Sequence, residues 1–433
     1  MTVHTQIVCT LCGCVCDDLE ITTENGKIVK AKGACANSNE KYMNFQQERI
    51  HNPVIKVNGQ SKETSVEEAL DKAAEILAAS KYPLLYGWSN TSSEAIRFGV
   101  ELTEELGGVI DNTASVCHGP GIEAIQEVGE STCTLGEVRD RADLIIYWGC
   151  NPTQAHMRHM LRYSSHSKGR YRTGRKDRKS IIIDVRKTLS SRTADQLIQL
   201  TPGKDFELIN TLRLAIKDEE LETEEVAGVP REKIEELADL MVSCEFGIVF
   251  FGLGLTHSNG RNENIAAAIS LVRDLNLRTK FVIMPMRGHH NVTGANKVAA
   301  WQTGYPFAVD FSHGYPRYNP GETSAVDLLR RGECDAALIV ASDPVAHMPH
   351  QAMEKLSKMP VVLVEPMPSA TSLLADVHIP VALIGIECAG TIYRMDGVPF
   401  LTKKVIDPPE NCRPDIEVLG ELLKRVKKLK GAS

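Results

Sequence analysis

The run Asp143-Leu-Ile-Ile-Tyr-Trp-Gly149 places five consecutive apolar residues between an aspartate and a glycine. A continuous apolar run of this length is typical of a strand that is buried on both faces, as in a parallel sheet. Six further runs share this character and cover residues 83–87, 180–184, 246–252, 280–284, 336–341 and 360–365. Because stretches with helical periodicity separate them, the pattern predicts an α/β fold with two doubly wound domains.

Shorter signals predict other elements. Asn25-Gly26 lies between two alternating stretches and predicts a β-hairpin. Ser65-Val-Glu-Glu68 fits a capping box, so we expect a helix to begin there. The segment 415–430 is amphipathic and ends in lysines, which predicts a C-terminal helix. The basic stretch 162–179 is interpreted as a solvated loop, with contact to an acidic partner or a cofactor phosphate as the alternative.

The bulk composition excludes several classes of protein. The 433 residues are 42% hydrophobic and 24% charged, as expected of a globular chain with a core. A formal net charge of −7 argues against a nucleic-acid binder, and no apolar run is long enough to predict a membrane span. The N-terminus has no signal-peptide pattern, so we expect a cytoplasmic protein whose cysteines are metal ligands or free thiols.

Four thiols lie within eight residues, in Cys9-Thr-Leu-Cys-Gly-Cys-Val-Cys16. Zinc usually takes two well-separated CxxC pairs, and the second pair is missing here. A four-iron cluster takes three thiolates from one tight loop, and Cys9, Cys12 and Cys16 with the later Cys35 supply that pattern. Gly13 is expected to allow the tight loop, and Cys14 is then spare. Spacing favours an iron–sulfur cluster, while zinc and free thiols remain open.

Other candidate site residues follow predicted strands or stand next to glycines. Cys117 and His118 precede Gly119-Pro-Gly121, although a single cysteine is more often a buried apolar residue. Arg287 follows a strand and is suited to binding a carboxylate through two parallel hydrogen bonds. Ligands bind at the strand ends of doubly wound sheets, and the weaker candidates there are Gly149, Asn151, Asp184, Gly203, Asp205, Gly252 and Gly254.

Taken in order, these features resemble the molybdopterin oxidoreductase superfamily. The order is CxxCxxxC with a later cysteine, Arg49-Ile-His-Asn-Pro53, the helix from Ser65 to Leu70, GxNP at 149–152, a strand-end aspartate, PGxD at 202–205, the GLG loop at 252–254, Ala375-Asp-Val-His-Ile-Pro380 and Gly390-Thr391. The match covers nearly the whole chain, and the ordered set is far more specific than any one piece.

Within that superfamily the chain most resembles the B-subunit family of formylmethanofuran dehydrogenases, the tungsten or molybdenum enzymes of methanogens. VCHGPG at 116–121 resembles that family's metal-ligand loop, and MRGHHNVTG at 286–294 resembles its active-site arginine segment. The chain also stops at Ser433, without the final β-barrel domain that single-chain formate dehydrogenases carry. The resemblance therefore implies that a separate small subunit supplies that domain.

The resemblance also implies a division of the chain. A small iron–sulfur domain is expected at 1–52 and a first Rossmann-like domain at 53–112 and 288–410. A second Rossmann-like domain is expected at 113–287, followed by a C-terminal helix at 411–433.

The residue roles that the resemblance implies concern three groups. Cys9, Cys12, Cys16 and Cys35 are expected to bind a 4Fe-4S cluster. Cys117 is expected to bind tungsten or molybdenum, with His118 and Arg287 beside the metal as catalytic residues. Two molybdopterin guanine dinucleotides are expected to contact Gly149, Asn151, Asp184, Gly203, Asp205, Gly252, Gly254 and Asn291. One departure is Asn37, where many relatives carry a lysine thought to lie between cluster and pterin.

The implied reaction is the reversible two-electron reduction of carbon dioxide to formate. Formate would pass to a metal-dependent amidohydrolase subunit that condenses it with methanofuran, with a small pterin-binding barrel subunit and ferredoxin-like polyferredoxin subunits as further partners. In that reaction His118, whose ring ordinarily titrates near neutrality, would exchange a proton or a hydrogen bond. The alternatives are a stand-alone formate dehydrogenase and a non-catalytic iron–sulfur electron-transfer scaffold.

Overall fold

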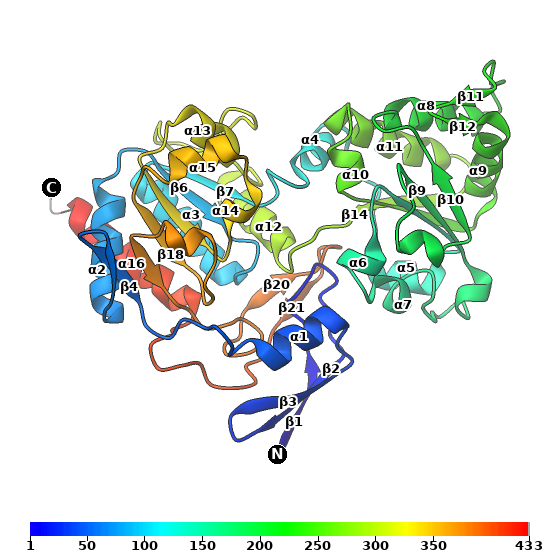
Figure 1. The fold of residues 1–433 in the computed structure, drawn as a ribbon. Helices are drawn as coiled ribbons and strands as arrows, with labels where there is room; N and C mark the ends of the chain where they lie inside the picture. The colour runs from blue at the N-terminus through cyan, green and yellow to red at the C-terminus, as the bar shows by residue number, and fades with distance from the viewer. Residues whose placement is uncertain (432–433) are drawn as a thin grey trace. The chain divides into compact units, whose positions relative to one another are not determined.

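The structure, a computed structural model, describes residues 1–431 (Figure 1). By its internal contacts the chain forms two compact units. Unit 1 consists of Met1–Val116 together with His289–Ser433, and unit 2 is Cys117–Gly288. Each unit is organised around a sheet of its own, so the two are described separately. None of the helices in residues 1–431 combines the length and apolarity that a membrane crossing requires.

Unit 2 contains a five-stranded parallel sheet in the order β10-β9-β8-β13-β14. Its strands are β8 Leu144–Trp148, β9 Lys179–Asp184, β10 Gln196–Gln199, β13 Phe246–Phe251 and β14 Lys280–Pro285. The chain winds from β8 to one edge and returns beside β8 with β13. The strand order therefore reverses between β8 and β13, which is the place where doubly wound sheets bind ligands.

Helices cover this sheet and complete its core. They are α4 Gly119–Val128, α5 Leu135–Arg141, α8 Asp205–Ala215, α9 Arg231–Ser243 and α11 Arg261–Leu275. Every residue of β8 and β13 is buried, as their continuous apolar sequences predict. The remaining short elements are α6 Pro152–Ala155, α7 His159–Arg162, η1 Arg175–Asp177, η2 Ser190–Arg192, β11 Glu225–Val226, β12 Val229–Pro230 and α10 Leu253–Thr256.

Unit 1 contains a nine-stranded mixed sheet in the order β16-β15-β7-β6-β17-β18-β19-β4-β5. Its parallel centre consists of β6 Pro83–Gly87, β7 Val109–Asn112, β17 Ala336–Val340, β18 Val361–Val364 and β19 Val377–Ile379. Antiparallel strands complete both edges, and they are β4 Val54–Val57, β5 Gln60–Glu63, β15 Val309–Asp310 and β16 Arg317–Tyr318. The strand order reverses between β6 and β17.

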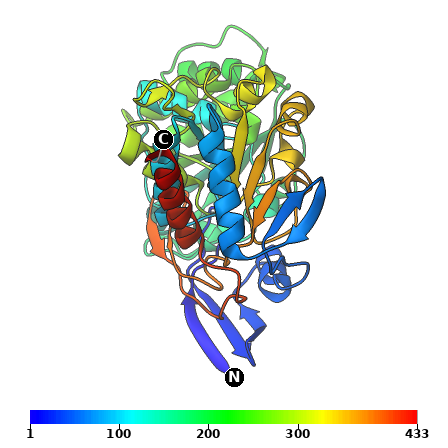
Figure 2. The ribbon, with the colours of Figure 1, turned by 90° about the vertical axis from the view of Figure 1, so that its left-hand side faces the viewer.

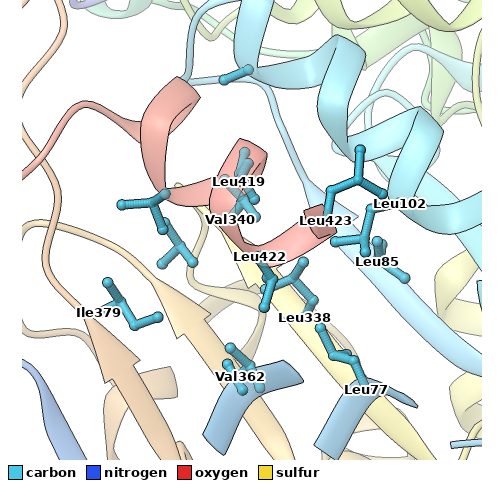
Figure 3. Close-up of a cluster of buried hydrophobic side chains, with 14 of the residues drawn as sticks. Leu77, Leu85, Leu102, Leu338, Val340, Val362, Ile379, Leu419, Leu422 and Leu423 are labelled. Atoms are coloured by element: carbon cyan, nitrogen blue, oxygen red, sulfur yellow. The ribbon is translucent and has the colours of Figure 1, made fainter. Parts of the chain in front are cut away.

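The sheet of unit 1 carries helices on both faces. One face packs against α2 Val66–Ala79, α3 Ser93–Leu106, α12 Val292–Thr303 and α16 Asp415–Gly431. Helix α16 lies beside α2, although their sequences are far apart (Figure 2). Leucines of α16 reach the sheet residues Leu338 and Val340 in a continuous apolar cluster (Figure 3). The other face packs against α13 Ala325–Arg331 and α15 His350–Leu356.

The N-terminal part of unit 1 is a three-stranded antiparallel sheet followed by a helix. Its elements are β1 Thr2–Ile7, β2 Leu19–Glu24, β3 Lys27–Lys32 and α1 Ala36–Asn44. Asn25 and Gly26 join β2 to β3 with φ angles of 50° and 73°, which confirms the predicted hairpin. The remaining short elements of unit 1 are α14 Pro344–His347, η3 Thr371–Leu373, β20 Thr391–Tyr393 and β21 Pro399–Leu401.

Candidate functional site

Two glycine loops meet at the carboxyl ends of β8 and β13 in unit 2. Gly254 N donates a hydrogen bond to Gly149 O at 2.9 Å. A Cβ atom on Gly254 would lie 2.6 Å from the Cα of Gly149, and one on Gly252 would lie 2.5 Å from the Cβ of Cys150. The predicted residues Gly149, Gly252 and Gly254 are thus brought together, because only glycine lets these two backbones approach so closely.

A cavity of about 430 Å³ in unit 2 lies beside the loop that follows β8. Asn151 lines it, as do the cationic side chains Arg186, Lys187 and Arg192. Asn151 Oδ1 accepts hydrogen bonds from the backbone N and the Oγ of Ser190, at 3.1 and 2.7 Å. This arrangement suits an anionic group such as a diphosphate. No motif in the sequence marks these three cations, although Arg186 and Lys187 follow the end of β9 and Arg192 ends η2.

The two predicted aspartates of unit 2 differ in their hydrogen-bond partners. Asp184 ends β9, accepts a hydrogen bond from Arg186 N at 3.2 Å, and has a pKa raised by burial. Asp205 is buried and accepts hydrogen bonds from Trp148 Nε1 at 2.8 Å and from Ser258 Oγ at 2.5 Å. Asp205 therefore ties the start of α8 to β8, and its contact with a cofactor stays a prediction.

Gly203 lies in the turn that precedes α8. Its φ angle is +77°, and a Cβ atom there would lie 2.7 Å from Asn259 Nδ2. The conformation and the close approach both require glycine, so the turn itself explains this residue. A role for Gly203 in binding a dinucleotide stays a prediction.

The basic stretch lines a different cavity of unit 2. This cavity is about 780 Å³ and includes Lys176 and Lys179 together with Asp143 and Asp195. Asp143 precedes β8 and Lys179 begins β9, so the cavity lies at the amino ends of these strands. Its lysines stand among carboxylates, and Arg175 pairs with Asp195 at 2.5 Å. The charges of the stretch are thus balanced locally, which favours the interpretation as a solvated surface.

Cys117, His118 and Arg287 come from two neighbouring places in unit 2. Cys117 and His118 directly precede α4, and Arg287 follows β14. His118 Nε2 donates a hydrogen bond to Met286 O at 3.3 Å. His156 Nε2 donates one to Arg287 O at 2.9 Å. Two imidazoles therefore hold the two successive carbonyl groups after β14, and His156 is a site residue that the sequence analysis missed.

Burial determines the electrostatics of these groups. Burial raises the pKa of the Cys117 thiol to about 11, and the positive charge of Arg287 partly opposes that rise. Burial and the same charge lower the pKa of His118 to about 3. Burial also lowers the pKa of Arg287, while Glu130 and Cys117 raise it. His118 therefore stays neutral at physiological pH, unlike the expected ring that titrates near neutrality.

Glu130 is a second residue that the sequence analysis missed. Burial raises its pKa to about 7, and the charge of Arg287 lowers it in part. Its Oε1 atom is buried and has no hydrogen-bond partner. In the sequence it follows Gly129 after a helix, which is also the pattern of a solvated loop, so no local signal marked it.

The donor set at the start of α4 fits a soft metal. Cys117 supplies one thiol there, and the Nδ1 atom of His118 is buried without a partner. Residues 1–431 contain no group of three or more His, Cys, Asp or Glu side chains placed to hold a metal ion. A metal at Cys117 would therefore take its other ligands from a cofactor, and a single thiolate suits soft transition metals rather than Mg²⁺ or Ca²⁺.

The cysteine loop, residues 9–16, lies in unit 1 and closes on itself. Cys9 N donates to Cys16 O at 2.8 Å, and Val15 N donates to Cys12 O at 3.0 Å. We expected Gly13 to allow the tight loop, but the residue with left-handed backbone in the loop is Val15, with a φ angle of 40°. Cys35 caps the start of α1, and no cysteine of the described residues forms a disulfide. The spacing of these thiols is that of a cluster held by a loop and one distant cysteine, and their binding of a 4Fe-4S cluster stays a prediction.

Asn291 lies in unit 1 at the start of α12 and is completely buried. Its Oδ1 accepts a hydrogen bond from Tyr393 N at 2.8 Å, and its Nδ2 donates one to Thr91 O at 2.7 Å. The side-chain amide thus holds two other segments of unit 1 together. Its predicted contact with a dinucleotide stays a prediction.

Comparisons with known proteins match this chain to one family. The family model described as molybdopterin oxidoreductase matches residues 49–425. The B subunit of tungsten-containing formylmethanofuran dehydrogenase 2 from Methanocaldococcus jannaschii is 49% identical over 98% of this chain and 98% of its own. The B subunit of the enzyme with the same name from Methanococcus maripaludis is 44% identical over 99% of this chain and 100% of its own.

A solved structure has the same fold. It is the formyltransferase/hydrolase complex of Methylorubrum extorquens with methylofuran. One of its chains matches with a TM-score of 0.72 and 23% identity, over 88% of this chain and 100% of that one.

Proposed function

This chain belongs to the molybdopterin oxidoreductase family and, within it, to the B subunits of tungsten-containing formylmethanofuran dehydrogenases, and we propose that it catalyses the reversible two-electron reduction of carbon dioxide to formate. The observation that carries this proposal is the identity of 49% with one such relative over 98% of both chains. The grouping of Cys117, His118 and Arg287 supports it.

The residues of unit 2 fit the cofactor of this family. Cys117 would bind tungsten or molybdenum, and two molybdopterin guanine dinucleotides would supply the other sulfur ligands. The glycine loops at the ends of β8 and β13 pack closely against each other at this edge of the sheet. The cations that follow β9 would bind the phosphates of the cofactor. When bound, the metal would supply the two-electron chemistry, and a 4Fe-4S cluster held by the cysteine loop of unit 1 would supply one-electron chemistry.

Arg287 would bind the carboxylate of formate. Its planar guanidinium offers two parallel hydrogen bonds to the two carboxylate oxygens, which fixes the orientation of the substrate. In a buried site this charge–charge contact is stronger than in water. The carboxylate of Glu130 raises the pKa of Arg287 and would help to hold the guanidinium charged in that buried position.

His118 would act as a neutral group. Because Nε2 donates its proton to Met286 O, Nδ1 is left as the acceptor atom of the ring. Nδ1 has no partner in the chain, so a proton or a hydrogen bond from the substrate side would find an unused acceptor there. The burial of His118 and of the Arg287 guanidinium keeps bulk water from competing for these contacts.

The product would be used by another subunit. We expect formate to pass to a metal-dependent amidohydrolase subunit, which condenses it with methanofuran. A small pterin-binding barrel subunit and polyferredoxin subunits would complete the complex. The relatives' names support a complex, because both are designated as one subunit of an enzyme.

Replacing Cys117 by Ala tests the proposal. The purified Cys117→Ala complex should lose formate oxidation with an artificial electron acceptor and keep its iron–sulfur absorbance. A matched control is Cys244→Ala, since that thiol lies at the amino end of β13 and donates to Met241 O at 3.2 Å. Full activity of the Cys117 variant would remove this residue from the mechanism.

A further inference from the structure

Helix α1 presents one face to the cysteine loop of unit 1. Ser38 Oγ lies 3.1 Å from Cys9 Sγ. Lys41 Nζ donates to Thr10 O at 2.6 Å and to Thr10 Oγ1 at 3.2 Å. Tyr42 OH donates to Val8 O at 3.4 Å. Residues three and four apart share a helix face, so the three side chains approach the loop as one set.

Lys41 is the only one of these three side chains that carries a charge. The residue is half-buried, and its ammonium group is desolvated enough that burial lowers its pKa. Thr10, which receives both of its hydrogen bonds, is almost completely buried and donates in turn to Ile384 O at 3.0 Å. The positive charge is therefore fixed against the backbone of the loop rather than free to move into water.

Three titratable groups of unit 1 face this ammonium group. Cys9 and Glu365 raise the pKa of Lys41, and the charge of Lys41 lowers that of the buried His290. Burial raises the pKa of Glu365 to about 7, so this carboxyl is only partly ionised near neutral pH. A buried cation that its neighbours neutralise only in part is costly, unless another negative charge lies nearby.

The proposed 4Fe-4S cluster would supply that negative charge. Four thiolates outweigh the positive charge of the iron–sulfur core, and each electron that enters adds one more negative charge. We propose that the ammonium group of Lys41 is a positioning charge that raises the reduction potential of this cluster. The inference rests on the proposed function, because the cluster is part of it.

Reduction of the proposed cluster is a one-electron step. The cluster gains one electron from a low-potential donor of the ferredoxin class, no bond in the chain forms or breaks, and no proton is taken up. The standing charge of Lys41 offsets the added negative charge. Net charge and hydrogen bonds near the sulfurs are the usual means by which a protein adjusts such a potential.

Three substitutions separate charge from hydrogen bonding. Lys41→Gln keeps a donor for Thr10 and removes the charge, Lys41→Met removes both, and Lys41→Arg keeps both. The full-length protein would be purified without oxygen, and the cluster would be titrated with redox mediators and followed by electron paramagnetic resonance. The matched control is Lys32→Met, since the Lys32 side chain is 64% exposed on β3.

The proposal predicts that the Gln and Met variants shift the midpoint potential to more negative values. At a fixed potential the ratio of reduced to oxidised cluster should fall about tenfold, which corresponds to about 59 mV for a one-electron couple. Lys41→Arg and Lys32→Met should keep the wild-type potential. The Gln variant also keeps the test decisive if the Met variant does not fold.

Two results would overturn the proposal. An unchanged potential in Lys41→Gln, with a normal cluster spectrum, would show that the charge has no such role. A shift of the midpoint potential in Lys41→Met but not in Lys41→Gln would also exclude a role for the charge, because the lost hydrogen bond to Thr10 would then be the cause. A wild-type protein without any cluster spectrum would instead contradict the proposed function, and this inference with it.

Discussion

His118 Nε2 lies 3.3 Å from the carbonyl oxygen of Met286 and donates a hydrogen bond to it. The contact joins the start of α4 to the segment after β14, and it fixes which ring nitrogen carries the proton. The other nitrogen, Nδ1, remains a buried acceptor without a partner. Such an arrangement holds a neutral imidazole in one orientation, ready to accept rather than to donate.

Replacing His118 by Phe should therefore reduce turnover without removing the bulk of the ring. A ring whose pKa is about 3 offers a hydrogen-bond acceptor and takes up no proton near neutral pH. The loss of one such hydrogen bond costs about 0.5–1.5 kcal/mol, so we expect formate oxidation to fall roughly 2- to 10-fold. Steady-state assays on the purified complex would measure it, with the exposed His350→Phe as the control. Unchanged turnover with intact metal content would exclude His118 from the reaction.

Arg287→Lys should keep the positive charge and lose the paired geometry. A lysine offers a point charge and not two parallel donors, so kcat/KM for formate should fall roughly 10- to 100-fold. Arg278→Lys, which changes a half-exposed arginine paired with Asp218, should have no effect. A conservative change at Arg287 that left kcat/KM intact would mean that formate does not make the paired contact.

Glu130→Gln should change the pH dependence of stability. The pKa of Glu130 is raised from 4.5 to about 7 by burial, so the folded chain holds this proton more tightly than the unfolded chain. Stability should then fall as pH rises from about 4.5 to about 7, on the order of 2 kcal/mol, and stay lower above that range. The Glu130→Gln variant should not show this fall in stability.

Denaturant unfolding of the wild type and of Glu130→Gln at about pH 5 and about pH 8 measures the difference. The exposed neighbour Glu127→Gln is the matched control. Equal pH dependence in the wild type and Glu130→Gln would show that Glu130 gains its proton equally in both states.

Leu422→Ala tests how α16 is held to unit 1. Leu422 is fully buried in the cluster of Figure 3, and its truncation should cost about 2–5 kcal/mol of unfolding free energy. Leu429, which is 43% exposed on the same helix, should change stability by less than about 0.5 kcal/mol when replaced by Ala. Similar costs for both would mean that exposed ion pairs, such as Arg425 with Asp71, and not packing hold the helix.

Strong local patterns predicted the centre of the fold. The apolar runs that follow Asp143 and begin at Phe246 became the adjacent buried strands β8 and β13, since a parallel sheet covered on both faces removes every side chain of such a run from water. Shorter or more polar strands escaped notice, among them β10 and β19. Their pairing is determined by neighbours in the sheet and not by their own residues.

The candidate site was predictable only where glycines or the end of a predicted strand marked it. Cys117 was selected because glycines follow it, and Arg287 because it follows a strand. His156 and Glu130 gave no such signal, because each acts through a contact that only the folded chain creates. The backbone of the cysteine loop was also not predictable, although its thiols were. Its left-handed residue is Val15, and local propensity would place a glycine in that conformation.

Elemental analysis by mass spectrometry of the native, anaerobically purified complex tests the central claim most directly. We expect about one tungsten or molybdenum atom per chain, bound through the soft thiolate of Cys117. The Cys117→Ala complex should lose the metal or, if it keeps the metal, lose formate oxidation. A wild-type complex that oxidised formate while containing neither metal would contradict it.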